Sequence, residues 1–333
     1  MGGNALKNTQ IERFDLYSYN LVKNDILNKL EKFAEIKFII DAPNKRDFGD
    51  LDILYKTETN IKLIIINLFD PVETITNGNI LSFAYSLNDK YYQIDMIETS
   101  NFEMSQFYYS YGDVGNILGR MVRESGLKLG VQGLFYHDDN LDKEIVILSN
   151  EPKQICEYLG LEYSKWGLFE YEHEIFNWII SSRFFVNEFY CCSKDKRKRK
   201  VRPMLQNYMD FIIDKPSNVI ENKQSEALLY FQKSETHNNI ILKKHALTER
   251  KKKFNGNKIM KYGFENKSVG FIIQEFKNHI NKLGGDVDDY FEIWLDTHDE
   301  VFIDTCLNNF TSTISHNCEE QIQHLKNRLT YNG

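Results

Sequence analysis

Hydrophobic residues follow two different spacings along the chain. Between residues 12 and 33 they recur every three or four positions, which predicts an amphipathic helix. Short apolar runs bounded by polar or turn-forming residues come next, and such runs are typical of β-strands. The strands expected from these runs are residues 36–40, 51–55, 61–68, 80–85 and 91–97. The pattern therefore predicts a mostly β core preceded by one helix.

Helical spacing dominates the rest of the chain. It predicts helices at residues 111–125, 151–159 (capped by Ser149 or Asn150), 172–187, 206–213, 225–233, 269–283 and 301–310. A short apolar run at residues 144–148 predicts one further strand. The expected fold class is α+β, with a small mixed or antiparallel sheet and flanking helices followed by a mainly helical C-terminal region. Three parts are expected: residues 1–105, 106–165 and 166–333.

The five cysteines are an odd number, and no CxxC pair occurs. This argues against a disulfide framework and against a zinc ribbon. The most apolar short run, residues 61–68, is interrupted by Lys62 and is too short to span a membrane. We therefore expect an intracellular, cytoplasmic protein with no membrane partner, or a nuclear one if the host is eukaryotic.

The net charge of −7 hides an uneven distribution. Residues 191–270 carry 19 lysines and arginines against 8 acids, a net of +11, so the remainder carries −18. A basic face suits the phosphate backbone of a nucleic acid. The densest basic run, residues 193–203, is either a solvated loop or localisation signal, or a contact with nucleic-acid phosphates. The second interpretation would place Arg197, Arg199, Lys200 and Arg202 on the phosphates.

Three aspartates in two expected strands are candidates for metal binding. Asp50 and Asp52 are two positions apart, so their side chains project from the same face of a strand. Asp95 lies in another apolar strand, where a carboxylate is costly unless it is hydrogen-bonded or binds a metal. One interpretation is that Asp50 and Asp52 mark the end of a strand and that Asp95 is the buried partner of an ion pair. The combination, with Gly49 allowing close backbone approach, favours a site for hard divalent cations.

The sequence around these acids resembles a known family. Residues 49–54, Gly-Asp-Leu-Asp-Ile-Leu, resemble the Gly-Asp-x-Asp-Val/Ile-Leu signature of family X DNA polymerases, in the DNA polymerase beta superfamily of nucleotidyltransferases. Residues 93–97 resemble the strand with that family's third aspartate. Residues 109–120 resemble its Tyr-Phe-Thr-Gly-Ser turn and following helix, and residues 126–135 resemble the segment that closes that subdomain. The family's Gly-Ser helix normally lies about ten residues before the paired aspartates. Here that stretch is predicted to be a strand and a polar loop, and the nearest candidate pair is Gly2-Gly3.

The resemblance implies nucleotidyl transfer with two Mg²⁺ or Mn²⁺ ions. Asp50 and Asp52 would bind both ions, and Asp95 would bind the ion at the attacking 3′-hydroxyl. Residues 1–105 would form the palm, residues 106–165 a nucleotide-binding subdomain, and residues 166–333 a basic nucleic-acid-binding region.

Further residues receive roles from the same resemblance. Asn116 and Arg120 lie one turn apart on an expected helix, which is also the pattern of a solvated polar face. The expected nucleotide contacts are Gly49, Lys45 and Arg46 near the triphosphate, Tyr109 and Gly112 at the sugar, and Asn116 and Arg120 at the nascent base pair. The expected nucleic-acid contacts in this part of the chain are Arg123 and Lys128.

A second resemblance concerns the acceptor. Residues 254–264 and 269–273 resemble a C-terminal segment of tRNA nucleotidyltransferases, which favours RNA. We predict an enzyme that extends the 3′-end of a DNA or RNA primer with nucleoside triphosphates, foremost a family X-like DNA polymerase. The alternatives are template-independent RNA terminal transfer of the CCA-adding or poly(A) type, transfer to a protein or small molecule, and a catalytically silent nucleic-acid-binding protein. The oligomeric state is not predicted.

Overall fold

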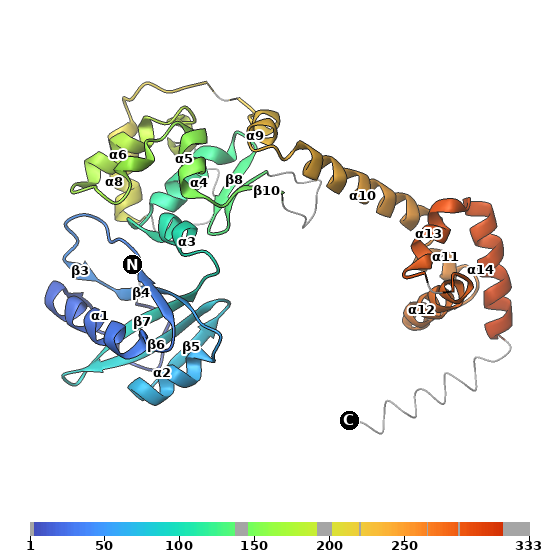
Figure 1. Ribbon diagram of the computed structural model, residues 1–333, viewed down its shortest axis with the longest axis horizontal. Helices are drawn as coiled ribbons and strands as arrows, with labels where there is room; N and C mark the ends of the chain where they lie inside the picture. Colours follow the sequence, from blue (N-terminus) through green and yellow to red (C-terminus); the bar gives the residue numbers. More distant parts are fainter. Residues whose placement is uncertain are drawn as a thin grey trace. The chain divides into compact units, whose positions relative to one another are not determined.

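The computed structural model describes residues 3–136, 146–191, 202–219, 221–264, 266–285 and 287–315. The chain separates into two compact units, Met1–Glu235 and Thr236–Gly333 (Figure 1). This boundary falls inside residues 166–333, which the sequence analysis kept as one region. Residues 166–235 therefore belong to the same compact unit as the predicted sheet.

Strands and helices are distributed unequally between the two units. The described strands, all in the first unit, are β1 (Phe14–Asp15), β2 (Glu35–Phe38), β3 (Asp47–Phe48), β4 (Asp50–Lys56), β5 (Thr74–Asn77), β6 (Ile80–Leu87), β7 (Lys90–Glu98), β8 (Leu127–Gly130), β9 (Gly133–Tyr136) and β10 (Val146–Ser149). The helices are α1 (Leu16–Leu30), α2 (Ile61–Phe69), α3 (Phe102–Tyr109), α4 (Val114–Arg123), α5 (Pro152–Leu159), α6 (Glu172–Ile180), α7 (Glu188–Cys191), α8 (Pro203–Ile212), α9 (Gln224–Tyr230), α10 (Ser234–Lys253), α11 (Gly256–Met260), α12 (Asn266–Leu283), α13 (Tyr290–Thr297) and α14 (Glu300–Ser315), with a short 3₁₀ helix at Tyr163–Lys165. Within the described ranges, no helix combines the length and apolar character needed to cross a membrane. The predicted α+β class is confirmed.

The central sheet has five strands in the order β2-β4-β7-β6-β5. Strands β4 and β7 pair in parallel, and the other neighbours pair antiparallel, so the sheet is mixed. In the parallel register Asp50 lies opposite Gln93, and Asp52 lies opposite Asp95. Side chains of paired residues project to the same face of a sheet. The register therefore brings all three predicted acids to one face.

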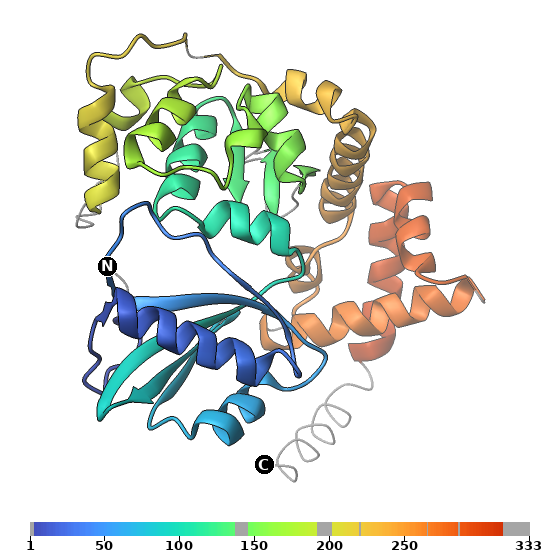
Figure 2. The same cartoon turned by 60° about the vertical axis from the view of Figure 1, so that its left-hand side comes forward.

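The two faces of this sheet are covered differently. Helices α1 and α2 pack on one face, where Leu51 and Ile53 of β4 join a common core with Val22 and Ile26 of α1. Figures 1 and 2 show α3 beyond the end of the sheet, next to α4. Because neighbouring residues in a strand alternate between faces, the acids of β4 lie on the face opposite to this core.

The expectation of a strand at residues 61–68 is wrong, because this segment forms α2. The side chain of Asn60 accepts a hydrogen bond from a backbone N–H of the first turn at 3.3 Å, which caps the helix. Asp70 ends it in the left-handed conformation. Ile61 and Ile65, one turn apart, are its buried residues. Packing of this stripe outweighs the β preference of branched side chains.

Other expected boundaries change at turns. The helix expected at residues 111–125 begins at Val114, because Tyr111 and Gly112 adopt left-handed φ values of 56° and 68°. The helix expected at 172–187 ends earlier, with α6. The N-cap of α5 is Glu151, not Ser149 or Asn150. The predicted elements did not include helices α3, α7, α10, α11 and α13 or strands β1, β3, β5, β8 and β9. Helix α10 buries none of its described residues, so it has no apolar stripe to reveal it.

A second sheet follows α4, with antiparallel strands in the order β10-β9-β8. Helix α4 packs against β8 and turns an apolar face inward, while Asn116 and Arg120 stay exposed. Gly115, in the first turn of α4, lies directly against α3. A Cβ atom at Gly115 would be 2.1 Å from the carbonyl oxygen of Tyr108. This glycine therefore allows the close approach of the two helices.

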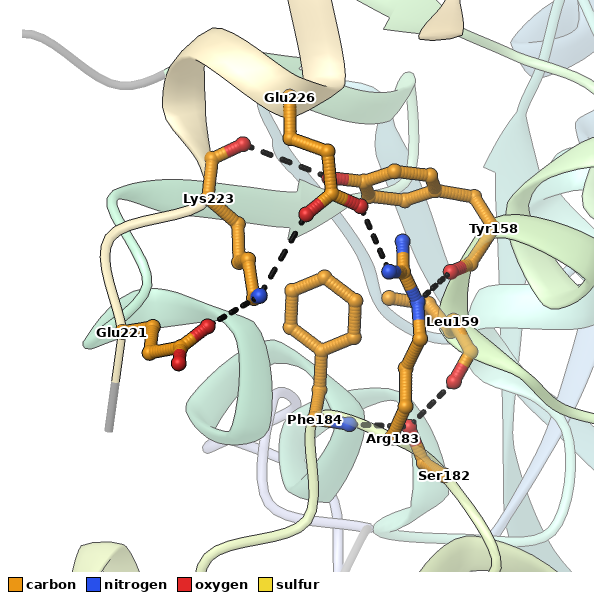
Figure 3. Close-up of polar contacts among 8 residues, drawn as sticks. All are labelled: Tyr158, Leu159, Ser182, Arg183, Phe184, Glu221, Lys223 and Glu226. Carbon is orange, nitrogen blue, oxygen red and sulfur yellow. Dashed lines mark hydrogen bonds and ion pairs between the residues drawn. The ribbon is translucent and has the colours of Figure 1, made fainter. Parts of the chain in front are cut away.

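A polar network fastens α9 to the rest of the first unit (Figure 3). Arg183, in the turn after α6, donates from Nε to the carbonyl of Tyr158 at 2.7 Å and from Nη1 to the carboxylate of Glu226 at 2.6 Å. Lys223 forms another ion pair with Glu226 at 3.4 Å. The Arg183 guanidinium also lies 4.6 Å from the centre of the Tyr158 ring. These contacts join α5, α9 and the turn after α6.

The second unit has a core of its own. Aromatic and aliphatic residues of α12, α13 and α14 pack around Phe276 and Trp294. The side chain of Lys258 in α11 is buried, and its Nζ donates to Glu300 at 2.7 Å and to Asp304 at 2.9 Å. The described part of this unit is helical, in agreement with the mainly helical C-terminal region predicted from the sequence.

Candidate metal centre

The three predicted acids meet where β4 and β7 pair. One carboxylate oxygen from each of Asp50, Asp52 and Asp95 lies within 4.8 Å of the other two. Their strands are held in place by apolar neighbours, such as Leu51 and Ile53, that are fully buried on the opposite face. The predicted convergence of the three side chains is confirmed.

The repulsion among the three carboxylates is clearest in the pKa of Asp52. Burial, followed by the charges of Asp50 and Asp95, raises the pKa of Asp52 to about 8. The charge of Lys45 opposes this rise, but its ammonium forms an ion pair with Asp41 at 3.2 Å. The described side chains therefore leave the three carboxylates without full compensation of their charge. A bound cation would supply it.

Hydrogen-bond donors orient two of the three carboxylates. Gln93 Nε2 lies 3.0 Å from both carboxylate oxygens of Asp95. Burial raises the pKa of Asp95, whereas hydrogen bonds from Ser82 and Gln93 lower it. The backbone N–H of Gly3 donates to Oδ2 of Asp50 at 2.9 Å. Such outer contacts fix the orientation of carboxylates that bind metals.

The available ligand atoms suit a small, hard divalent cation. Carboxylate oxygens are the ligands that Mg²⁺ and Mn²⁺ prefer. In the part of the chain that the structure describes, no histidine or cysteine joins this cluster, unlike the usual sites for zinc. Asp50, Asp52 and Asp95 thus fit the ions that the family resemblance implies.

The loop between β2 and β3 carries the residues expected near the triphosphate. Lys45 donates to Asp41, and Arg46 is exposed. Gly49 is buried, and Gly3 lies so close that a Cβ atom on Gly3 would be 2.3 Å from the Gly49 carbonyl oxygen. The close approach expected at Gly49 is therefore made by another segment of the chain. The roles of Lys45 and Arg46 at a triphosphate stay predictions.

Helices α3 and α4 carry the other predicted nucleotide contacts. Tyr109 lies at the end of α3, and burial, followed by the charges of Tyr108 and Asp52, raises the pKa of its hydroxyl. Gly112 lies in the left-handed turn between the helices. Asn116 and Arg120 are exposed on α4. The nucleotide-binding roles of Tyr109, Gly112, Asn116 and Arg120 stay predictions.

The predicted nucleic-acid contacts have varied surroundings. Arg123 ends α4 and Lys128 lies in β8, and both are exposed. Arg202 forms an ion pair with the buried Asp113 at 2.9 Å, so its guanidinium has a partner within the chain. Outside the described residues lie Arg197, Arg199 and Lys200. Contact of these residues with phosphates stays a prediction.

Two contributors to the site, Asp41 and Gln93, were not predicted, and Gly3 was expected only as part of the candidate Gly2-Gly3 pair. Gln93 lies two positions before Asp95 in the same strand, so the strand period could have identified it. Asp41 accepts a hydrogen bond from the Tyr19 hydroxyl at 2.8 Å, a contact that no local pattern indicates. Gly3 is far from the acids in sequence, and its contact with them depends on the tertiary fold.

Comparisons with known proteins place the chain in no family. No protein-family model matches it, and a search of the curated proteins found no match.

Proposed function

We propose that the protein is a metal-dependent nucleotidyltransferase that extends the 3′-end of a nucleic acid with nucleoside triphosphates. The observation that carries this proposal is the cluster of Asp50, Asp52 and Asp95 on two parallel neighbouring strands. The order of the Gly-Asp-Leu-Asp-Ile-Leu motif and the third-aspartate strand supports it. In this proposal the five-stranded sheet is a palm of the DNA polymerase beta type.

In this proposal the three acids bind the two ions in different ways. Two Mg²⁺ or Mn²⁺ ions, when bound, would lower the pKa of the attacking hydroxyl and stabilise the charge on the leaving pyrophosphate. Asp50 and Asp52 would hold both ions, and Asp95 would hold the one nearer the hydroxyl. The hydrogen bonds from Gln93 keep the carboxylate of Asp95 in a fixed orientation.

The exposed face of α4 supports a nucleic acid as the acceptor. Asn116, Arg120 and Arg123 are spaced by four and three residues, so they lie along one face of the helix. An amide and two guanidinium groups in a row suit base edges and phosphates. In this proposal that face lies along the nascent base pair and the primer, and a family X-like DNA polymerase is the first choice.

An extension assay tests the proposal. Labelled DNA and RNA primers, each with and without a complementary template, are incubated with dNTPs or NTPs and with Mg²⁺ or Mn²⁺. We expect metal-dependent addition of dNTPs that requires the template. Addition of NTPs to RNA without a template would instead identify terminal transfer of the CCA-adding or poly(A) type.

The variant Asp95→Asn provides the matched test of the mechanism. It removes one negative charge from the cluster while keeping the size of the side chain, so we expect extension to fall to background and primer binding to persist in fluorescence anisotropy. Asp70→Asn, a change of the same kind at an exposed position, should leave extension unchanged. Full extension by Asp95→Asn would overturn the proposed role of the cluster.

A further inference from the structure

Residues 3–8 form a segment that we call the strap, which lies against the end of the central sheet. Its far end is anchored at three places. The side chain of Leu6 is buried, and the backbone N–H groups of Lys7 and Asn8 donate to the carboxylate of Glu73 at 3.0 and 3.1 Å. The strap is therefore held by contacts that are independent of the acidic cluster.

The near end of the strap reaches two of the three acids. The N–H of Gly3 donates directly to Asp50 Oδ2 at 2.9 Å. The N–H of Ala5 donates to Gln93 Oε1 at 2.9 Å, and the Nε2 of the same amide donates to Asp95 at 3.0 Å. Asp50 and Gln93 are opposite each other in the pairing of β4 with β7. Two strap residues thus bond to two neighbouring strands.

Only a glycine fits at the first of these positions. Gly3 has a φ of 82°, in the left-handed region that other residues rarely adopt. A Cβ atom there would also lie 2.3 Å from the carbonyl oxygen of Gly49, far inside contact distance. The backbone of the strap consequently lies directly on the residue that precedes Asp50. A larger residue at position 3 must move the donor away from the carboxylate.

Backbone and amide donors can orient a carboxylate and still leave lone pairs free to bind an ion. A carboxylate has two oxygens with several lone pairs, so one oxygen can accept a hydrogen bond while the other binds an ion. Hydrogen bonds to a charged acceptor are among the stronger ones, and outer-shell partners of this kind usually change metal affinity by about 10- to 100-fold.

We propose that the strap positions the acidic cluster for its ions, with Gly3 and Gln93 as the positioning residues. Gly3 orients Asp50 directly. Gln93, itself oriented by the N–H of Ala5, orients Asp95. This inference rests on the proposed function, because it assumes that the cluster binds divalent cations. It adds a segment outside the recognised motifs to the machinery of the site.

Binding of Mn²⁺ to the metal-free protein tests the proposal, with unbound Mn²⁺ measured by electron paramagnetic resonance. An affinity tag belongs at the C-terminus so that the strap keeps its native sequence. We expect Gly3→Ala and Gln93→Met each to weaken Mn²⁺ binding about tenfold. Asn4→Ala, an exposed strap residue between the two donors, should bind Mn²⁺ like the unmodified protein.

The melting temperature of each metal-free variant, followed by circular dichroism, separates positioning from general stability. Positioning predicts weaker Mn²⁺ binding by Gln93→Met even where its melting temperature equals that of Asn4→Ala. If Gly3→Ala fails to fold, a variant that lacks residues 2–5 takes its place, with the same expected loss of affinity.

The outcomes distinguish this proposal from the proposed function. If Asp52→Asn abolishes Mn²⁺ binding but the strap variants and Gln93→Met bind normally, the strap proposal is overturned and the metal centre stands. If the unmodified protein binds no Mn²⁺, or if Asp52→Asn binds it as well as the unmodified protein does, the metal centre itself is overturned, and the role of the strap falls with it.

Discussion

At the scale of one residue, Asp52 shows that the acidic cluster places a carboxylate where its charged form is unfavourable. Burial and the neighbouring carboxylates raise its pKa to about 8, against 3.8 for an unperturbed aspartate. Between these two values the folded state binds a proton more tightly than the unfolded state does. The contribution of Asp52 to the free energy of unfolding of the metal-free protein must therefore fall as the pH rises from 3.8 to about 8.

The variant Asp52→Asn should remove this loss, because an amide of the same shape cannot ionise. We expect the metal-free variant to be more stable than the unmodified protein at pH 8, by about 1–3 kcal/mol, and the difference to shrink toward pH 4. Urea unfolding at a series of pH values measures it. A difference that is constant across this range, or that grows toward low pH, would contradict the assigned pKa.

Addition of Mg²⁺ should compensate the negative charge of the Asp52 carboxylate. A bound cation stabilises the folded state, and it must displace the proton of Asp52 in order to bind. We therefore expect Mg²⁺ to raise the melting temperature of the unmodified protein more at pH 8 than at pH 5, and to have no effect on Asp52→Asn. Na⁺ at the same ionic strength controls for general screening of charge. Equal stabilisation at both pH values would place the effect of Mg²⁺ away from Asp52.

At the scale of elements, the strands of the acidic cluster could be predicted and their connections could not. Period-two alternation identified β4 and β7, and the spacing of Asp50 and Asp52 gave their common face. Their parallel register is a tertiary property, and so is the contact of the strap with them. The isoleucine-rich segment of α2 could not be assigned from its sequence, because a short apolar run fits a strand and a buried helix equally well.

Gly115 gives a test at this scale, since it sets how closely α4 approaches α3. Gly115→Ala would force a methyl group against the Tyr108 carbonyl, so we expect it to destabilise the first unit by about 1–3 kcal/mol. Gly270→Ala is the matched control: Gly270 lies within α12 with open space around it, and the change should stabilise that helix by about 0.5–1 kcal/mol. Chemical denaturation of both variants measures the change in the free energy of unfolding, which should be a loss for Gly115→Ala and a gain for Gly270→Ala. A stabilising Gly115→Ala would show that α4 can shift without loss.

At the scale of the whole molecule, part of the basic charge is used inside the second unit rather than displayed. Arg250 forms ion pairs with Glu292 and Asp296. Lys253 donates to two backbone carbonyls near the end of α13 at 2.8 Å. Counting charges along the sequence cannot separate such residues from free ones, because their partners lie more than 40 positions away. The predicted basic binding surface is therefore smaller than the composition indicates.

The buried Lys258 offers a test of whether the two units are stable independently. Its side chain is 8% exposed, whereas its partners Glu300 and Asp304 are 60% and 41% exposed. Replacing both partners by Gln and Asn leaves a buried ammonium without compensation, which should cost about 3–5 kcal/mol. Lys258→Met should cost much less, because the two acids it releases already reach water. The asymmetry follows from which partner is buried.

Hydrogen exchange with mass spectrometry can locate these effects along the chain. The Glu300→Gln and Asp304→Asn double variant should lose protection in peptides of α11–α14 and keep it in peptides of β4 and β7, because the two units have separate cores. Mg²⁺ should show the reverse pattern, protecting the strands that carry the acids and leaving the second unit unchanged. Parallel loss of protection in both units would mean that they unfold together, and the separate cores would then not be separate units of stability.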